Sequence, residues 1–70
     1  MKSIEMHYRR PGDKEDQLKR LEGKTVGYEF FGRSTGAELA RIWADKHTFI
    51  IPVRYVRSIE VQAEDEDVKV

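Results

Sequence analysis

The stretch FIIPVRYVRSIEV, residues 49–61, is the most apolar part of the chain, and a proline interrupts it. Proline cannot donate a ladder hydrogen bond, so Pro52 belongs at a strand end, a sheet edge or a bulge. After it, apolar residues recur every three positions, which is the spacing of a tight 3₁₀-like turn. These residues are Val53, Val56 and Ile59. The pattern predicts a strand over residues 47–52, a one-turn corner, and a closing strand over residues 57–61.

The chain has 70 residues and no cysteine. A domain this small is marginally stable unless disulfides, metals or self-association support it. Without cysteine it has no disulfides and no thiolate ligands, so we expect a homo-oligomer in a reducing, cytoplasmic environment. No apolar run approaches the roughly 18 residues of a membrane-spanning helix, and we therefore expect no membrane association.

Two other segments have the alternation of half-buried strands. In residues 3–9 the apolar side consists of Ile4, Met6 and Tyr8, and in residues 25–31 it consists of Val26, Tyr28 and Phe30. Gly27 weakens the second strand unless the sheet bends there or another backbone comes close, so we expect a sharp bend. The sequence GRSTG at residues 32–36 predicts a turn.

Residues 13–22, DKEDQLKRLE, predict a short helix. A Pro-Gly break precedes them, Asp13 is a suitable N-cap, and Gly23 is a suitable stop. The only apolar residues, Leu18 and Leu21, are spaced i, i+3. Such a helix is expected to lie on the surface.

Residues 36–46 fit two interpretations. Thr35 and Glu38 match a capping box, and the alanine and leucine content favours a helix. Alternation instead places Leu39, Arg41 and Trp43 on one face, as in a strand that returns from the glycine turn. The strand is favoured because another strand and a corner follow it.

The order of these elements resembles the Sm-like superfamily, which includes Hfq. The resemblance rests on a glycine-turn hairpin, an apolar-x-x-Asp step at Ile42-x-x-Asp45, a strand, a one-turn corner and a closing strand ending SIEV, and it covers residues 13–62. It implies a mainly β fold, a small and strongly bent five-stranded barrel with a short N-terminal helix. It also implies ring-forming oligomers and binding of single-stranded RNA. A second helix at residues 36–46 would make the fold α+β instead.

Residues 1–63 are predicted to form one small domain, and residues 64–70 an acidic, disordered tail. Glu64 to Asp67 hold four of the thirteen acidic residues, which leaves twelve Lys/Arg against nine Asp/Glu in residues 1–63. The body is mildly basic and the tail acidic. A tail of this composition keeps a protein soluble. A second hypothesis is that it competes with phosphates for the arginines of the corner.

The sequence contains no recognisable catalytic motif. Its serines and histidines lie in no nucleophile motif, and it has no phosphate-binding glycine loop. Asp45 and His47 would share one face of a strand, but two ligands do not make a metal site. We therefore expect a protein that is not an enzyme and has neither a cofactor nor a metal.

The best candidate for a binding site is the corner. Its two valines are expected to point inward, so Arg54, Tyr55 and Arg57 form an exposed cation–aromatic cluster. Arginines bind phosphates, and an aromatic ring stacks on a nucleobase. Further stacking candidates are Trp43, Tyr28, Phe30, Phe31 and Phe49, although so small a chain needs its large apolar side chains for the core or for oligomer contacts.

Two functions remain open. The first is an oligomeric, non-catalytic nucleic-acid-binding module that favours single-stranded RNA. The second is a protein–protein interaction or assembly module, whose sheet edges pair between subunits or with another protein. The balance of thirteen basic and thirteen acidic residues favours the second function. The corner cluster and the Sm-like pattern favour the first.

Overall fold

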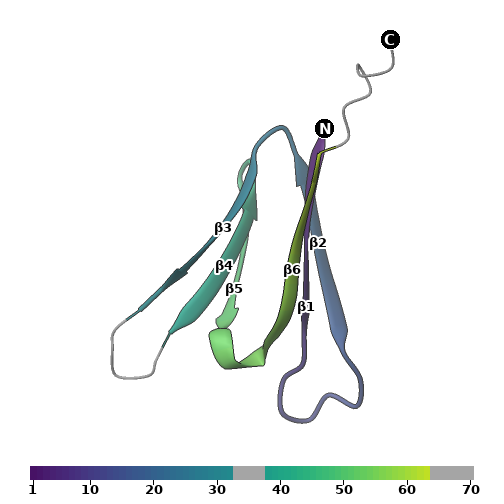
Figure 1. The fold of residues 1–70 in the computed structure, drawn as a ribbon, viewed down its shortest axis with the longest axis vertical. Helices are drawn as coiled ribbons and strands as arrows, with labels where there is room; N and C mark the ends of the chain where they lie inside the picture. The colour runs from purple at the N-terminus through teal and green to yellow at the C-terminus, as the bar shows by residue number, and fades with distance from the viewer. Residues whose placement is uncertain (33–37, 64–70) are drawn as a thin grey trace.

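A computed structural model describes residues 1–32 and 38–63 of the chain. Six strands and one 3₁₀ turn make up most of these residues. They are β1 (Lys2–Tyr8), β2 (Gln17–Gly23), β3 (Val26–Phe31), β4 (Leu39–Ala44), β5 (His47–Pro52), η1 (Val53–Tyr55) and β6 (Val56–Ala63). The strands form two antiparallel sheets, in the orders β2-β1-β6 and β3-β4-β5 (Figure 1). The predicted tail and most of the predicted glycine turn lie outside the described residues.

The chain passes between the two sheets by short connections. After the β1–β2 hairpin, Lys24 and Thr25 form a bend that leads directly into β3 of the second sheet. Strands β3, β4 and β5 follow one another as an antiparallel meander. Then η1 returns the chain to the first sheet, where β6 pairs with β1 (Figure 1). The first and last strands are therefore neighbours, with Lys2 opposite Ala63.

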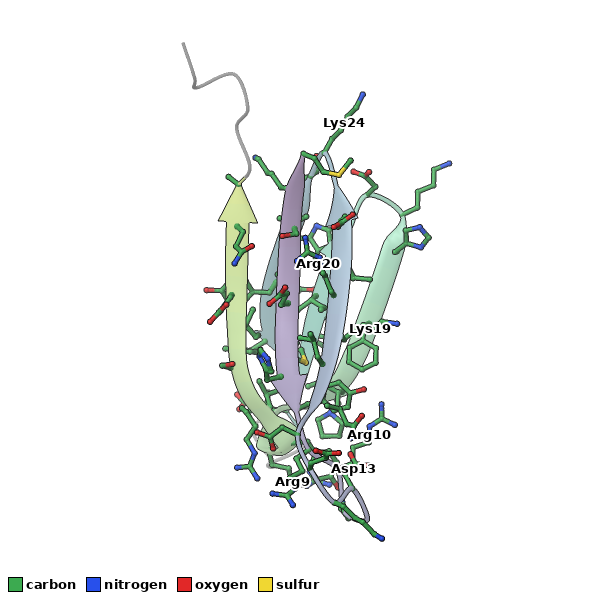
Figure 2. The ribbon with its side chains drawn as sticks, turned by 90° about the vertical axis from the view of Figure 1, so that its right-hand side faces the viewer. Arg9, Arg10, Asp13, Lys19, Arg20 and Lys24 are labelled. Atoms are coloured by element: carbon green, nitrogen blue, oxygen red, sulfur yellow. The ribbon has the colours of Figure 1, made fainter. Side chains whose placement is uncertain are left out.

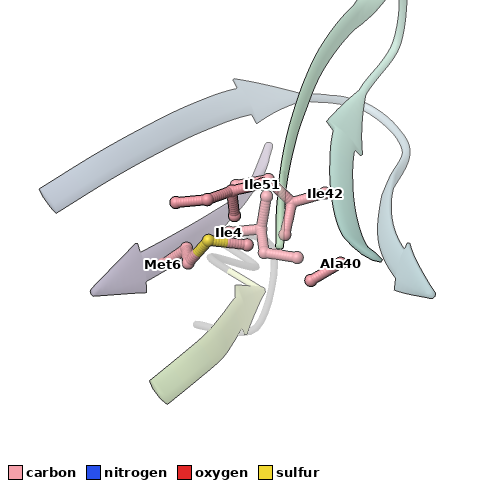
Figure 3. Close-up of a cluster of buried hydrophobic side chains, with 5 residues drawn as sticks. All are labelled: Ile4, Met6, Ala40, Ile42 and Ile51. Carbon is pink, nitrogen blue, oxygen red and sulfur yellow. The ribbon is translucent and has the colours of Figure 1, made fainter. Parts of the chain in front are cut away.

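The core lies between the two facing sheets, which spread apart toward the end that holds η1 (Figure 1). Alternation along β4 buries every second side chain, and the apolar side of β1 packs against these residues. The buried hydrophobic residues are Ile4, Met6, Ala40, Ile42, Ala44 and Ile51, five of which are drawn in Figure 3. Because the core is this small, each of its side chains carries a large share of the stability.

The mainly β class is confirmed, but the closed five-stranded barrel is wrong. Among the described residues, β2, β6, β3 and β5 each pair with a neighbour on one side only. The bend at Lys24 and Thr25 separates β2 from β3, so that β2 belongs to the first sheet and β3 to the second. It precedes Gly27, which lies within β3 directly opposite Trp43. A Cβ atom at Gly27 would overlap the Trp43 ring, so this glycine makes room for an indole.

The predicted helix over residues 13–22 is also wrong, since residues 17–23 form strand β2. Every residue of β2 pairs with a residue of β1, and this ladder outweighs the local preference for helix. Leu21 packs against the core while Leu18 is 52% exposed, as expected for side chains on opposite faces of a strand. Asp13 caps a turn instead, because its carboxylate accepts a hydrogen bond of 2.9 Å from the Arg10 N–H.

The other predicted strands are confirmed. Strand β4 occupies Leu39–Ala44, so the alternative helix at residues 36–46 is excluded. The corner after Pro52 is the 3₁₀ turn η1, and β1 and β6 are strands as expected. None of the described residues belongs to a helix with the length and apolar character needed to cross a bilayer.

Candidate nucleic-acid interface

The corner η1 is held between the two sheets by backbone bonds and by its valines. Pro52 has a φ of −58° and ends β5, and the next N–H, that of Val53, donates to the Glu38 carbonyl at 3.0 Å. The Val56 N–H closes the turn on the Val53 carbonyl. Both valines pack against the core, in agreement with their spacing of three. These bonds and contacts hold the backbone of the corner in place, and its polar side chains extend from that backbone.

Arg54 and Tyr55 form a cation–aromatic pair on this corner. The Arg54 guanidinium carbon lies 4.8 Å from the centre of the Tyr55 ring, and Nη2 donates to the Tyr55 hydroxyl at 3.4 Å. Arg54 is exposed, whereas Tyr55 is half-buried and packs against the core. The pair therefore presents a positive charge and part of one aromatic ring to solvent.

Arg57 has a different environment from the other two predicted residues. It is the extra residue of a bulge in the β1–β6 ladder, between the residues opposite His7 and Tyr8. Its Nε lies 3.9 Å from the Asp16 carboxylate, and both side chains are more than half exposed. The structure thus brings Arg54 and Tyr55 together and directs Arg57 toward an acidic residue of the neighbouring loop.

The loop between β1 and β2, residues 9–16, lies beside the corner. The Arg9 N–H donates to the Tyr55 carbonyl at 2.9 Å, which joins the start of the loop to η1. The Arg9 guanidinium donates to the carbonyls of Asp13 and Lys14, the latter at 2.6 Å. Arg9 therefore shapes the loop, and the loop and the corner form one end of the molecule.

A second cation–aromatic cluster adjoins this end. The rings of Tyr8 and Phe49 lie 5.3 Å apart, which brings together β1 of one sheet and β5 of the other. Arg10 lies 5.1 Å from the centre of the Tyr8 ring, and the Lys19 ammonium 5.4 Å from that of Phe49. Figure 2 shows Arg10 and Lys19 on the side of the molecule that carries β2, with Lys24 at the far end.

Two arginines of the described residues are neutralised by nearby carboxylates. Arg20 binds Glu5 at 2.7 Å and Glu22 at 2.8 Å, and Arg41 binds Glu29 at 3.0 Å. Hydrogen bonds to the carboxylates of Glu22 and Glu5 raise the pKa of Arg20.

Three other cations have no such neutralisation. Within residues 1–32 and 38–63, no carboxylate forms an ion pair with Arg10, Lys19 or Arg54. These three cations lie instead against aromatic rings. We call them, with Tyr8, Phe49 and Tyr55, the basic–aromatic surface. Its three rings are half-buried and pack against the core, and the described part of the chain encloses no pocket.

Other sequence candidates have structural roles. The Trp43 indole packs against Gly27 of the neighbouring strand, and the cation beside it, Arg41, is neutralised by Glu29. The Asp45 carboxylate accepts hydrogen bonds from the N–H groups of Lys24 and Thr25. In the described residues no group of three potential ligands could hold a metal ion.

Sequence reasoning did not identify Arg10, Lys19 and Tyr8 as site residues. Lys19 was missed because residues 13–22 were predicted to form a helix. In the strand at 17–23, Lys19 lies on the same face as Leu21. Arg10 could have been recognised from the sequence, since a tyrosine and two arginines, Tyr8, Arg9 and Arg10, follow one another at the end of a predicted strand. The approach of Phe49 to Tyr8 depends on how the two sheets pack and has no local signature.

Comparison of the chain with protein-family models, with curated proteins and with solved structures found no match in any of the three.

Proposed function

We propose that this chain is an oligomeric, non-catalytic module that binds single-stranded nucleic acid, RNA in preference to DNA, in the cytoplasm. One observation carries the proposal: Arg10, Lys19 and Arg54 lie against aromatic rings and have no carboxylate partner among the described residues. Such cations bind phosphates with release of counterions, and aromatic rings stack on bases of any sequence.

The arrangement suits a single strand better than a duplex. The backbone bond between Arg9 and Tyr55 links the two clusters, because Arg9 precedes Arg10 and Tyr55 follows Arg54 in the chain. A strand bound at this end would meet cations of both clusters. Only an unpaired strand exposes the faces of its bases to aromatic side chains. The preference for RNA rests on the Sm-like resemblance.

The test is the affinity for a fluorescently labelled single-stranded RNA of mixed sequence at low salt. Arg10→Ala combined with Lys19→Ala should weaken binding on the order of tenfold, because two cations that neutralise phosphates are removed. Arg54→Ala should act in the same direction. The matched control is Lys24→Ala combined with Lys46→Ala, which removes the same charge from exposed positions outside the basic–aromatic surface.

Two results would contradict the proposal. If both double variants lose affinity equally, binding follows net charge and not this surface. If the unmodified protein does not bind RNA even at low salt, the second candidate function takes its place. That candidate is an assembly module, and the observation that favours it is the exposure of Tyr28, Phe30 and Phe31 on one edge strand.

A further inference from the structure

Strand β3 is an edge of its sheet, since β4 is its one partner in the described part of the chain. Its exposed aromatic residues are unusual for an edge: Tyr28 is 50% exposed, Phe30 56% and Phe31 39%. Tyr28 and Phe30 lie opposite Ile42 and Ala40, so both belong to the core-facing side of the sheet. The opposite sheet leaves these two rings uncovered, and they contact each other with centres 6.0 Å apart.

The other edge strands carry features that hinder the addition of a further strand. Charged side chains, prolines and bulges are the common protection of edges. Strand β2 carries three charged residues, β5 ends at Pro52, and β6 contains the bulge at Arg57. The one charged residue of β3 is Glu29, which Arg41 neutralises at 3.0 Å. Strand β3 is therefore the least protected edge.

We propose that β3 pairs antiparallel with β3 of a second copy of this chain, with the two-fold axis passing beside Tyr28. This deepens the oligomeric part of the proposed function and rests on residues outside the basic–aromatic surface. The pair would join the two β3-β4-β5 sheets into one continuous sheet, and the two faces of each sheet would remain aligned.

The charge pattern of β3 selects both the partner and the register. In a symmetric antiparallel pair, residues directly opposite each other share a face, so the axis must pass beside a residue. The two registers that pair most of β3 are centred on Tyr28 and on Glu29. An axis at Glu29 would set two carboxylates opposite each other, which is unfavourable.

The register centred on Tyr28 avoids that repulsion. It places Glu29 opposite Gly27 of the other copy, which carries no charge and has the Trp43 ring beside it, and Phe30 opposite Val26. The exposed rings of Tyr28 and Phe30 then lie side by side with those of the second copy on the core-facing side. A strand of this chain is thus complementary to itself, and the added apolar burial supplements a small core.

Single-cysteine variants test the inference directly, because the natural chain has no cysteine and any disulfide must join two copies. Opposite residues of an antiparallel pair have Cα atoms about 4.5–5.5 Å apart, within the range of a disulfide. Tyr28→Cys should form a disulfide-linked dimer under mild oxidation. Leu18→Cys, on the edge strand β2 and 52% exposed, should form no cross-link under the same conditions.

Glu29→Cys distinguishes the two registers. It should cross-link more slowly than Tyr28→Cys, because in the proposed register each Glu29 faces a glycine of the other copy. Faster cross-linking of Glu29→Cys would overturn the register. Equal cross-linking of Tyr28→Cys and Leu18→Cys, or none for Tyr28→Cys, would overturn the proposed edge.

Light scattering without oxidant provides a second measurement. The unmodified protein should have twice the chain mass, and Phe30→Lys should reduce it to the mass of one chain. Ile50→Lys is the matched control, because Ile50 is 49% exposed on the other edge of the same sheet. A monomeric unmodified protein would overturn the inference. No nucleic acid is present in these assays, so failure here is distinct from failure of RNA binding.

Discussion

The Asp45 carboxylate occupies the space in which a side chain at Gly23 would have to stand. An ideal Cβ atom at Gly23 would come within 2.5 Å of Asp45 Oδ2. Asp45 itself has a φ of 53° in the tight β4–β5 turn, a conformation that aspartate tolerates better than most residues. Its backbone N–H donates to the Thr25 carbonyl at 2.9 Å while its carboxylate accepts from the bend. One residue thus fastens the turn of the second sheet to the crossing between the sheets.

Gly23→Ala should destabilise the protein by about 1 kcal/mol, because the added methyl group displaces the carboxylate from its backbone donors. Urea denaturation measures the change. In an Asp45→Gly background the alanine has room, so the two changes should couple by about 0.5–3 kcal/mol. Additive effects would mean that the contact between positions 23 and 45 contributes nothing to stability.

Gly27→Ala should destabilise by about 1–3 kcal/mol and shift the fluorescence of Trp43, because the new methyl group overlaps the indole. Trp43 is the one tryptophan of the chain, so emission reports on this ring alone. Gly12→Ala is the control: Gly12 has a φ of 98° with open space around it. That variant should lose stability through backbone strain and leave the emission unchanged. A shift in both variants would contradict the local explanation.

Leu21→Ala should cost about 1–2 kcal/mol, whereas Leu18→Ala should stay within about 0.5 kcal/mol, since only Leu21 packs against the core. Thermal or urea unfolding of both variants provides the comparison. In the helix suggested by local sequence, the two leucines would share one stripe and lose similar stability. Equal losses would therefore contradict strand β2.

Salt dependence should separate phosphate binding from stacking in the interaction with RNA. For a single strand, the slope of log affinity against log salt decreases in magnitude by about 0.7 for each phosphate that the protein no longer neutralises. Arg10→Ala combined with Lys19→Ala should flatten the slope by up to about 1.4. The Lys24→Ala and Lys46→Ala control should leave it near that of the unmodified protein. An unchanged slope in the first variant would mean that neither cation binds a phosphate.

Most of the fold could be predicted from local patterns. Alternation identified β1, β3 and β4, and the three-residue spacing after Pro52 identified the corner and the strand after it. These signals succeed because each strand buries one face and Pro52 cannot continue a ladder. The error fell on β2, whose charged residues are compatible with a surface helix and with an exposed edge strand alike. Only its pairing with β1 decides between them, and pairing is not a local property.

The candidate site was less predictable than the fold. Arg54 and Tyr55 are adjacent in the chain and could be recognised together. The cluster of Tyr8, Phe49 and Lys19 depends on two sheets meeting and on the correct register of β2. A tertiary contact between residues this far apart leaves no spacing that a single sequence reveals.

The pairing of β1 with β6 also determines when the molecule can fold. The two strands come from opposite ends of the described chain, so their pairing has a high contact order and its loop closure costs more entropy than a hairpin. During synthesis the β1–β2 hairpin emerges early. Strand β1, the central strand of the first sheet, lacks its second neighbour until residues 56–63 have left the ribosome. Ile4 and Met6 therefore remain open to non-native contacts until β6 has emerged, and this part of the nascent chain is most prone to aggregate just before β6 appears.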